Sequence, residues 1–249
     1  MAVIAIVTGA TSGIGRQFAL QLKGISNIDE LWLTGRNREA LSEFSDEVAI
    51  EADISTDEGI DRIREKIEAE RPEILFLINC AGLGYRAGFA DQTPGMISDT
   101  IDVNCRALTL LTSVCIPYMK KGGSHIINVA SSAGFIPQPG FSVYAASKSY
   151  VISFSRSLSR ELKSSGITVT AVCPGPVRTG FQSRATSGKE DEFSGFRSKV
   201  AKEPDEIAKR SLKAAMSGRD VLVIGLSQKF LHTAAKIIPI SWILGLIKW

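Results

Sequence analysis

Short apolar runs alternate with longer segments of helical periodicity along most of the chain. The runs lie at residues 3–7, 31–34, 75–79, 125–130, 167–173 and 221–224, with a weaker one at 48–52. Several are apolar almost throughout, which is typical of parallel strands covered on both faces. Helices are predicted between them at about residues 13–24, 37–45, 57–70, 96–120, 141–164 and 204–217. This alternation predicts an α/β fold built on a doubly wound parallel sheet of seven strands with helices on both faces.

The overall composition is that of a globular protein, and two segments differ from the rest of the chain in their local composition. The 249 residues are 44% hydrophobic and 22% charged, which fits a single domain over residues 1–249 and excludes disordered and fibrous classes. The least regular stretch, about 176–202, is long enough to predict a lid over a site. The last stretch, about 226–249, is an apolar tail.

Charge and cysteine usage exclude several classes of function. The net charge of +3 is too small for a nucleic-acid reader, so no nucleic-acid partner is expected. The excess of basic over acidic residues is concentrated near the end of the chain, because residues 197–249 hold ten basic and four acidic residues. The four cysteines form no C-x-x-C pair and there are two histidines, so reduced thiols and no metal site are expected.

The apolar segments at the two ends of the chain predict a cytoplasmic protein that is at most peripheral to membranes. No basic segment precedes the first apolar run, as a secretory signal would require. The longest uncharged run of the tail, residues 237–247, has 11 residues and contains a proline and a glycine. A spanning helix needs about 20 apolar residues.

A glycine-rich loop joins the first strand to the first helix. It reads Thr-Gly-Ala-Thr-Ser-Gly-Ile-Gly over residues 8–15. Glycines there allow a tight turn and a close approach of backbone to a pyrophosphate, which the free N–H groups of a helix N-terminus then bind. The loop therefore predicts a Rossmann-type nucleotide site, whereas glycines that merely permit the turn are the simpler alternative.

Arg36 decides the expected cofactor. An acidic residue about 20 positions after the glycines would bind the ribose 2′-hydroxyl of NAD. The second strand ends instead in Gly35-Arg36-Asn37, with no carboxylate. A guanidinium can bind a 2′-phosphate through two hydrogen bonds, so NADP(H) is expected in preference to NAD(H).

Tyr144 and Lys148 form a candidate acid–base pair at the start of a predicted helix. They are four residues apart and therefore project from the same helix face. A neighbouring ammonium favours the phenolate and is expected to lower the pKa of the phenol. Ser131 precedes Tyr144 by thirteen residues and follows an apolar strand, where groups lining a crevice gather.

Together these motifs resemble the short-chain dehydrogenase/reductase family, in its single-domain branch of about this length. The resemblance covers residues 3 to about 224. It adds Asp53 after the third strand, Asn79-Cys80-Ala81-Gly82 after the fourth, Asn104 on the long helix and Pro174-Gly175 after the sixth strand. The family often has a second asparagine where this chain has Cys80.

The resemblance implies a role for each matching residue. Tyr144 would be the general acid–base, Ser131 would bind the substrate oxygen, Lys148 would assist Tyr144 and hold the nicotinamide ribose, and Asn104 would support a proton-relaying water. Asp53 would reach the adenine and Thr179 the carboxamide. The expected catalytic residues are Asn104, Ser131, Tyr144 and Lys148. The expected cofactor-binding residues are Gly9, Thr11, Ser12, Gly13, Ile14, Gly15, Arg36, Asp53, Ile54, Asn79, Ala81, Gly82, Tyr144, Lys148, Pro174, Gly175, Val177 and Thr179.

Two assignments have alternatives. Ser132 adjoins Ser131, so the choice of serine depends on counting back from Tyr144. Phe181, Phe193 and Phe196 in the predicted lid are either substrate contacts or anchors of the loop.

The expected reaction is hydride transfer between NADP(H) and a ketone or secondary alcohol. The apolar tail favours a hydrophobic substrate of steroid or 3-oxoacyl type, and it has three interpretations: a subunit contact, a cover on the substrate cleft, or a membrane-surface helix. The family usually pairs through its two long helices, here about 96–120 and 141–164, so a homodimer or homotetramer is expected. The alternatives are a non-catalytic nucleotide-binding scaffold and a membrane-peripheral protein.

Overall fold

A parallel sheet forms the centre of the molecule. The computed structural model describes residues 1–186 and 200–246. Its seven strands follow the order β3-β2-β1-β4-β5-β6-β7, and every neighbouring pair is parallel. The strands are β1 (Val3–Thr8), β2 (Glu30–Gly35), β3 (Val48–Glu51), β4 (Glu73–Asn79), β5 (His125–Val129), β6 (Thr168–Pro174) and β7 (Val221–Ile224). The predicted fold class is confirmed.

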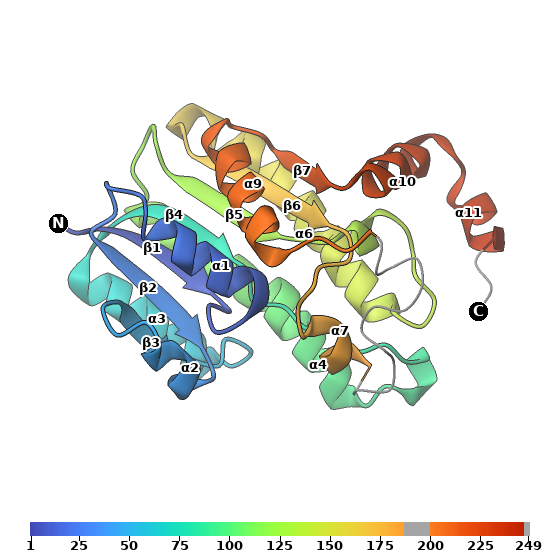
Figure 1. The fold of residues 1–249 in the computed structure, drawn as a ribbon, viewed down its shortest axis with the longest axis horizontal. Helices are drawn as coiled ribbons and strands as arrows, with labels where there is room; N and C mark the ends of the chain where they lie inside the picture. The colour runs from blue at the N-terminus through green and yellow to red at the C-terminus, as the bar shows by residue number, and fades with distance from the viewer. Residues whose placement is uncertain (187–199, 247–249) are drawn as a thin grey trace.

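Helices cover both faces of this sheet (Figure 1). One face is packed by α1 (Gly13–Leu22), α2 (Arg38–Ser42) and α9 (Pro204–Met216), and the other by α3 (Asp57–Glu70), α5 (Leu108–Cys115) and α6 (Ser142–Glu161). The strands β1, β4 and β6 bury almost every side chain because both faces are covered there. In α3, Ile60, Ile63 and Ile67 form the buried stripe that their spacing predicts.

The predicted helix over residues 96–120 is not a single α-helix. It consists of α4 (Pro94–Ile101), a π-helical turn η2 (Asp102–Ala107), α5, and a short 3-10 turn η3 (Ile116–Tyr118). Turns of this wider kind are rare and occur mostly at functional sites. Here the π turn contains Asn104, whose side chain is buried.

Shorter elements complete the described chain. The 3-10 turns are η1 (Phe89–Asp91), η4 (Ser132–Phe135) and η5 (Lys163–Ser165). The helices α7 (Phe181–Ala185), α10 (Leu226–Ile237) and α11 (Ile240–Leu246) follow β6 and β7. None of the helices formed by residues 1–186 and 200–246 combines the length and the apolar character needed to cross a bilayer.

The strand order reverses its direction of growth between β1 and β4. From β1 the chain builds outward through β2 and β3, then returns to place β4 on the other side of β1. The loops after β1 and β4 therefore diverge, and in open parallel sheets this is where ligands bind.

Candidate active site

The loops after β1 and β4 are held together by Thr8, at the point where the strand order reverses. The Thr8 hydroxyl accepts hydrogen bonds from the backbone N–H groups of Cys80 and Ala81, each at 3.0 Å. A Cβ on Gly9 would lie 2.9 Å from Cα of Ala81, so only a glycine permits this approach. The sequence singled out the glycines but missed Thr8.

A cleft of about 880 Å³ opens between these loops and the segments after β2, β5 and β6. Most of the residues predicted to bind cofactor or substrate line it. They are Gly9, Thr11, Ser12, Gly13, Ile14, Gly15, Arg36, Asp53, Ile54, Ala81, Gly82, Ser131, Tyr144, Lys148, Pro174, Gly175, Val177 and Thr179. Asn79 and Asn104 do not line the cleft.

The start of α1 has the features of an anion site. Ser12 precedes the helix in an extended conformation, and its side chain makes no capping hydrogen bond. The first N–H groups of the helix therefore have no capping side chain and adjoin the cleft. These groups and the helix dipole fit a pyrophosphate.

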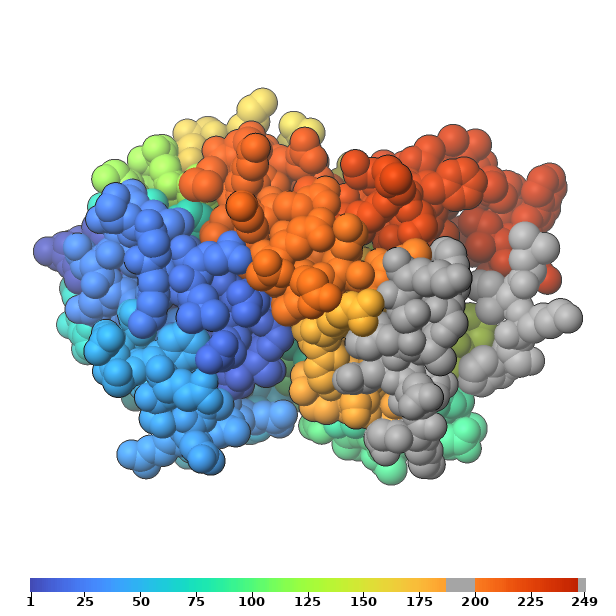
Figure 2. All heavy atoms as spheres, in the orientation of Figure 1, coloured from blue at the N-terminus to red at the C-terminus, as the bar shows by residue number. Residues whose placement is uncertain are grey.

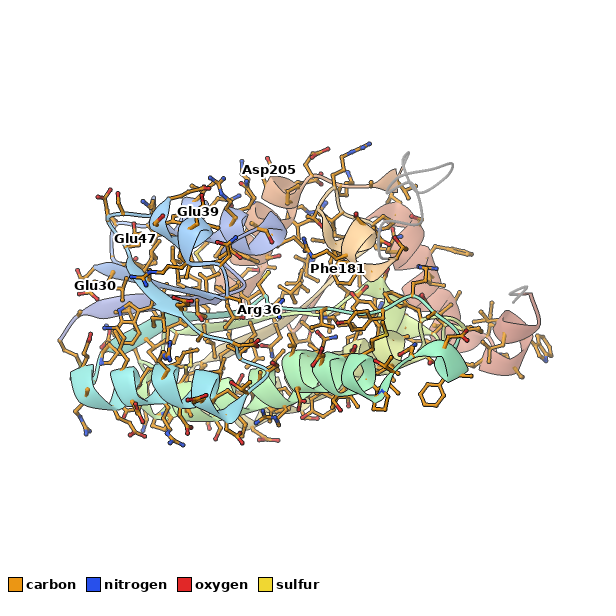
Figure 3. All side chains as sticks on the ribbon, turned by 90° about the horizontal axis from the view of Figure 1, so that it is seen from below. Glu30, Arg36, Glu39, Glu47, Phe181 and Asp205 are labelled. Carbon is orange, nitrogen blue, oxygen red and sulfur yellow. The ribbon has the colours of Figure 1, made fainter. Side chains whose placement is uncertain are left out.

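The opposite end of the cleft carries Arg36 and Asp53. The Arg36 guanidinium lies 3.7 Å from the Asp53 carboxylate and is 70% exposed. Burial raises the pKa of Asp53, but hydrogen bonds from Ser55 and the charge of Arg36 outweigh it, so the pKa is lowered. Figure 3 shows Arg36 at the end of its strand, toward the middle of the molecule. Arg38, which the sequence analysis missed, also lines this end.

These groups fit a nicotinamide dinucleotide. The helix start can take the pyrophosphate, Asp53 is placed to accept a hydrogen bond from the adenosine, and Arg36 and Arg38 supply positive charge beside it.

Asn79 has a structural position rather than the predicted place beside the nucleotide. Its amide nitrogen donates to Thr112 Oγ1 at 3.0 Å and to Asn128 Oδ1 at 2.8 Å. Asn128 in turn donates to Ser155. Asn79 is buried. Its chain of hydrogen bonds links β4, β5, α5 and α6.

Tyr144 lies in an apolar pocket at the start of α6. Its ring stacks on Phe141 with centroids 4.2 Å apart and meets Phe181 at 5.3 Å. Burial raises the pKa of the phenol to about 12, although a hydrogen bond with Ser131 acts in the opposite direction. The expected lowering by Lys148 is therefore not what the protein groups produce, because desolvation dominates.

Lys148 follows one turn later on α6. Its Nζ donates to the backbone oxygen of Val129 at 2.9 Å and lies 5.7 Å from the centroid of the Tyr144 ring. Burial lowers the pKa of the ammonium to about 8. The carbonyl of Val129, at the end of β5, thus fixes Lys148 at the floor of the cleft.

The structure distinguishes Ser131 from Ser132. Ser131 lines the cleft and shares a hydrogen bond with Tyr144, and its Oγ also accepts from the N–H of Ala133 at 3.1 Å. Ser132 begins η4 and is not among the lining residues.

Asn104 positions the loop beneath the catalytic helix. Its amide nitrogen donates to Leu83 O at 2.8 Å and to Ser147 Oγ at 2.9 Å, and its Oδ1 accepts from Leu83 N at 3.0 Å. Both hydrogens of the Asn104 side-chain amide have partners. A water can therefore bind Asn104 only by donating a hydrogen bond to Oδ1 or to the backbone oxygen. The π turn aims Asn104 at Leu83 and Ser147.

The predicted lid is described only at its two ends. Thr179, Phe181 and Arg184 line the cleft, and the Phe181 ring packs against Tyr144, a contact that fits either of its predicted roles. Figure 3 shows Phe181 on the helix α7. Phe193 and Phe196 lie outside the described residues.

Gly84, Tyr85 and Asp99 also line the cleft and were not predicted. A Cβ on Gly84 would overlap Cδ2 of the Tyr144 ring. Burial and the neighbouring Asp99 carboxylate raise the pKa of the Tyr85 phenol, which is hydrogen-bonded to Asp99. Gly84 and Tyr85 follow the Asn79–Gly82 motif closely in the sequence, whereas Asp99 on α4 carries no such signal.

Comparison with known proteins decides the family. The sequence model described as short chain dehydrogenase matches residues 3–190. The chain belongs to the short-chain dehydrogenase family. It is therefore an oxidoreductase of that family, as its motifs predict.

Individual relatives agree with this assignment. An uncharacterized oxidoreductase of Staphylococcus epidermidis is 32% identical, with 71% of this chain and 78% of that protein covered. Estradiol 17-beta-dehydrogenase 11 of Homo sapiens is 29% identical, with 95% and 79% covered.

Solved structures show the same fold. A short-chain dehydrogenase from Sphingobium yanoikuyae, in complex with NADPH, superimposes with a TM-score of 0.80 at 27% identity, covering 100% of this chain and 97% of that one. Other solved relatives are complexed with NADP+ or with NADH.

Proposed function

We propose that this protein is an NADP(H)-dependent oxidoreductase that interconverts a hydrophobic ketone and its secondary alcohol. The observation that carries the proposal is the arrangement of Ser131, Tyr144 and Lys148. All three side chains line one cleft, at the opposite end from Arg36, with the glycine loop between. A protein that only binds nucleotide does not need an acid–base tyrosine hydrogen-bonded to a serine.

The chain's own groups provide proton transfer and orientation. When bound, the nicotinamide dinucleotide supplies or accepts the hydride. Tyr144 donates its phenolic proton to the carbonyl oxygen in reduction and takes a proton from the alcohol in oxidation. Because burial holds the pKa of this phenol at about 12, it is protonated at neutral pH and ready to act as the acid.

Ser131 and Lys148 act around this proton. The Ser131 hydroxyl, hydrogen-bonded to Tyr144, can donate a hydrogen bond to the same substrate oxygen and stabilise the developing negative charge. Lys148 is held by Val129 O beside the Tyr144 ring, where its positive charge stabilises the tyrosinate that remains after proton donation.

The decisive experiment replaces Tyr144 by Phe. The variant removes the proton but keeps the ring that packs on Phe141, so it should fold and bind NADPH normally while kcat falls about 1,000-fold. Tyr118→Phe is the matched control because Tyr118 is outside the cleft, and it should retain full activity. Unchanged turnover of Tyr144→Phe on every substrate accepted by the native protein would refute the mechanism.

Cofactor choice is tested at Arg36. Arg36 and Arg38 carry the positive charge that would bind the 2′-phosphate of NADPH. The ratio kcat/KM should therefore be higher with NADPH than with NADH. Arg36→Asp should shift that preference toward NADH by at least about tenfold, because a charged hydrogen bond is lost and a like charge is added. A native preference for NADH would contradict the proposal.

A hydrophobic substrate is supported by the apolar surroundings of Tyr144. The rings of Phe141 and Phe181 pack against its own ring, and Phe181 and Leu83 line the cleft. NADPH oxidation should be measured with steroid ketones, 3-oxoacyl thioesters and small polar ketones, with the Tyr144→Phe protein as background. Activity on the small polar ketones alone would contradict a hydrophobic substrate while leaving the reaction type intact.

A further inference from the structure

The last described segment forms an arm beyond the sheet. After β7 the chain continues into α10 and α11, which extend away from the strands (Figure 1). Figure 2 shows the arm, in red, along one edge of the molecule beyond α9. None of the residues 226–246 lines the cleft, so the arm does not cover the substrate in this structure.

The arm is attached through one face of α10. That helix packs against η4 and β7. The His232 ring packs at a tilt against Phe135 of η4 with ring centroids 4.6 Å apart, and Gln228 lies against Gly175 and Gly225. Because η4 begins directly after Ser131, the arm is fixed to the segment that carries the candidate active site.

The outward face of α10 is apolar, which is the reverse of an ordinary surface helix. Leu226, Phe230 and Ile237 are spaced by four and seven residues and lie on one stripe. Their side chains are 85%, 77% and 76% exposed. Trp242 on α11 adds a fourth large apolar side chain, 71% exposed. So much exposed apolar surface in one place is the mark of an interaction surface.

Positive charge borders the apolar stripe. Lys229 and Lys236 are seven residues apart, so they share one side of α10 next to Phe230 and Ile237. Both lysines are exposed. The sequence contains no Asp or Glu after Asp220. The arm is therefore a helix pair whose charged groups are all basic.

A basic cavity of about 440 Å³ lies at the start of α10. Lys202, Arg210 and Lys229 line it beside the exposed Leu226. Glu206 pairs with Lys202 at 3.3 Å and with Arg210 at 3.0 Å, and Lys229 makes no ion pair that involves the described residues. The positive charge of the arm thus extends onto the body of the protein.

We propose that the arm docks on the surface of a bilayer that contains anionic lipids. The stripe formed by Leu226, Phe230 and Ile237 inserts between the headgroups together with Trp242 of α11, and Lys229 and Lys236 pair with lipid phosphates. This combination of a large apolar face and a purely basic border is that of interfacial helices. The cleft is thereby held next to a store of hydrophobic molecules, a consequence that rests on the proposed function, whereas the docking itself does not.

Charge favours a lipid surface over a second copy of the chain. A twofold contact places the same patch of both copies together. Two arms packed face to face would bring four lysines together, and the arm offers no carboxylate to neutralise them. An anionic bilayer supplies the missing negative charge.

The test is flotation of the full-length protein with vesicles. The protein should float with phosphatidylcholine vesicles that contain phosphatidylglycerol, and much less with phosphatidylcholine alone or at high salt. Lys229→Glu/Lys236→Glu should reduce partitioning into the anionic vesicles at least about tenfold. Phe230→Asp/Trp242→Asp should abolish flotation. Phe89→Asp is the control, since Phe89 is 63% exposed outside the arm, and it should float like the native protein.

Three outcomes would overturn the proposal. They are the absence of flotation with anionic vesicles, equal flotation of the native protein and both arm variants, and a change of the native oligomer to monomer in Phe230→Asp/Trp242→Asp without any vesicle binding by the native protein. The last result would assign the arm to a second copy. Ketone reduction with a water-soluble substrate, measured in parallel, keeps failure of docking separate from failure of the proposed reaction.

Discussion

Burial acts in opposite directions on the two titratable groups of the candidate active site. It raises the pKa of the Tyr144 phenol to about 12 and lowers the pKa of the Lys148 ammonium to about 8, because in each case desolvation favours the neutral form. Tyr144 is thus kept as a proton donor. Below pH 8, Lys148 is charged although it is buried, and this lowers the free energy of unfolding by an amount that can be measured.

Lys148 should make the free energy of unfolding depend on pH. Its pKa is lower in the folded protein (about 8) than the ordinary 10.5, so the unfolded chain binds more protons between these values and stability rises with pH through that window. The contribution should grow by about 2 kcal/mol from pH 7 to 9.5. Urea unfolding of the native protein and of Lys148→Met measures it as their difference.

The nearby thiols also titrate and are coupled electrostatically to Lys148, so the contribution of Lys148 is measured mainly below pH 9. Burial raises the pKa of Cys80 and of Cys173 to about 12, so these groups lower stability above pH 9 in either variant. A native-minus-variant difference that stays constant with pH would show that Lys148 is not desolvated.

Gly84 should be as important to turnover as a residue that touches substrate. A Cβ there overlaps the Tyr144 ring, so Gly84→Ala must displace the phenol from Ser131. A shift of about 1 Å at a reacting group costs on the order of 100-fold in kcat. Steady-state kinetics should show that loss with little change in KM for NADPH. Gly95→Ala, where the nearest side-chain atom would be 3.8 Å away, is the control.

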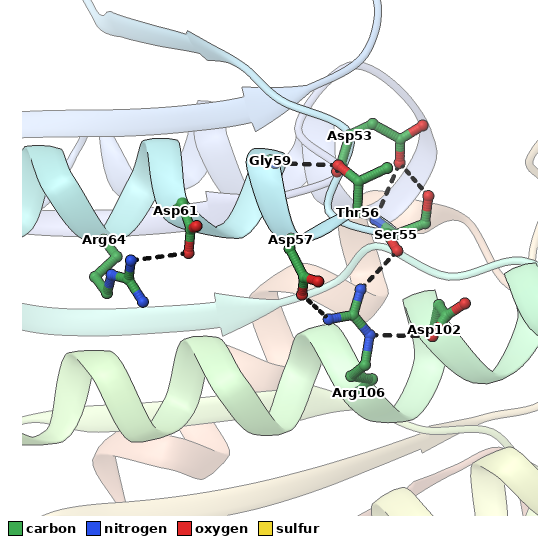
Figure 4. A network of polar contacts seen from close by, with 9 residues as sticks. All are labelled: Asp53, Ser55, Thr56, Asp57, Gly59, Asp61, Arg64, Asp102 and Arg106. Atoms are coloured by element: carbon green, nitrogen blue, oxygen red, sulfur yellow. Dashed lines mark hydrogen bonds and ion pairs between the residues drawn. The ribbon is translucent and has the colours of Figure 1, made fainter.

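At the scale of elements, Arg106 joins the π turn to the adenosine end of the cleft. Its guanidinium donates to Asp57 at 2.6 Å, to Asp102 at 3.0 Å and to Ser55 O at 2.8 Å, as Figure 4 shows. Ser55 in turn donates two hydrogen bonds to Asp53. One side chain thus ties η2, α3 and the Asp53 loop together.

Arg106→Gln should weaken cofactor binding rather than the chemical step. Loss of the ties to Ser55 and Asp57 frees the Asp53 loop, and we expect KM for NADPH to rise about fivefold, which corresponds to about 1 kcal/mol, with kcat retained. Arg64→Gln on α3 is the control, because its ion pairs with Asp61 and Glu68 stay within the helix. An equal effect of both substitutions would point to a general loss of stability.

The periodicity of apolar residues predicted the regular strands and helices well. It failed where contacts between distant parts of the chain determine the local structure. The run 75–79 had to be a buried strand, and Ile60, Ile63 and Ile67 had to face the sheet. The π turn at 102–107 carries no such signal, and the partners of its Asn104, Leu83 and Ser147, lie far away in the sequence. For the same reason, Asn79 looked like a ligand residue although its partners are Thr112 and Asn128.

At the scale of the whole molecule, the candidate active site and the exposed apolar stripe of α10 are separate. At the cleft, the positive charge expected to attract an anionic cofactor comes from the start of α1 and from Arg36. The basic excess of residues 197–249 lies in the region that includes α9 and the arm. The sequence predicted this asymmetry, but only the fold shows that the apolar stripe of α10 faces outward.

The long helices present a second apolar surface, through which we expect the protein to form a homodimer or homotetramer. Leu110 on α5 and Tyr150 on α6 are 40% and 42% exposed. Thr109 and Tyr150 share a hydrogen bond of 2.8 Å, so the two helices form one continuous face. A face shared by two helices can meet its own copy about a twofold axis.

Leu110→Glu should therefore break the assembly. Sedimentation velocity of the native protein should give a dimer or tetramer, and the variant should give monomer, because each twofold contact would bury two carboxylates near each other. Phe230→Asp on the arm should leave the assembly intact, because the arm is a separate surface. A native protein that sediments as monomer would contradict the prediction, and a variant that stays assembled would place the contact elsewhere on the surface.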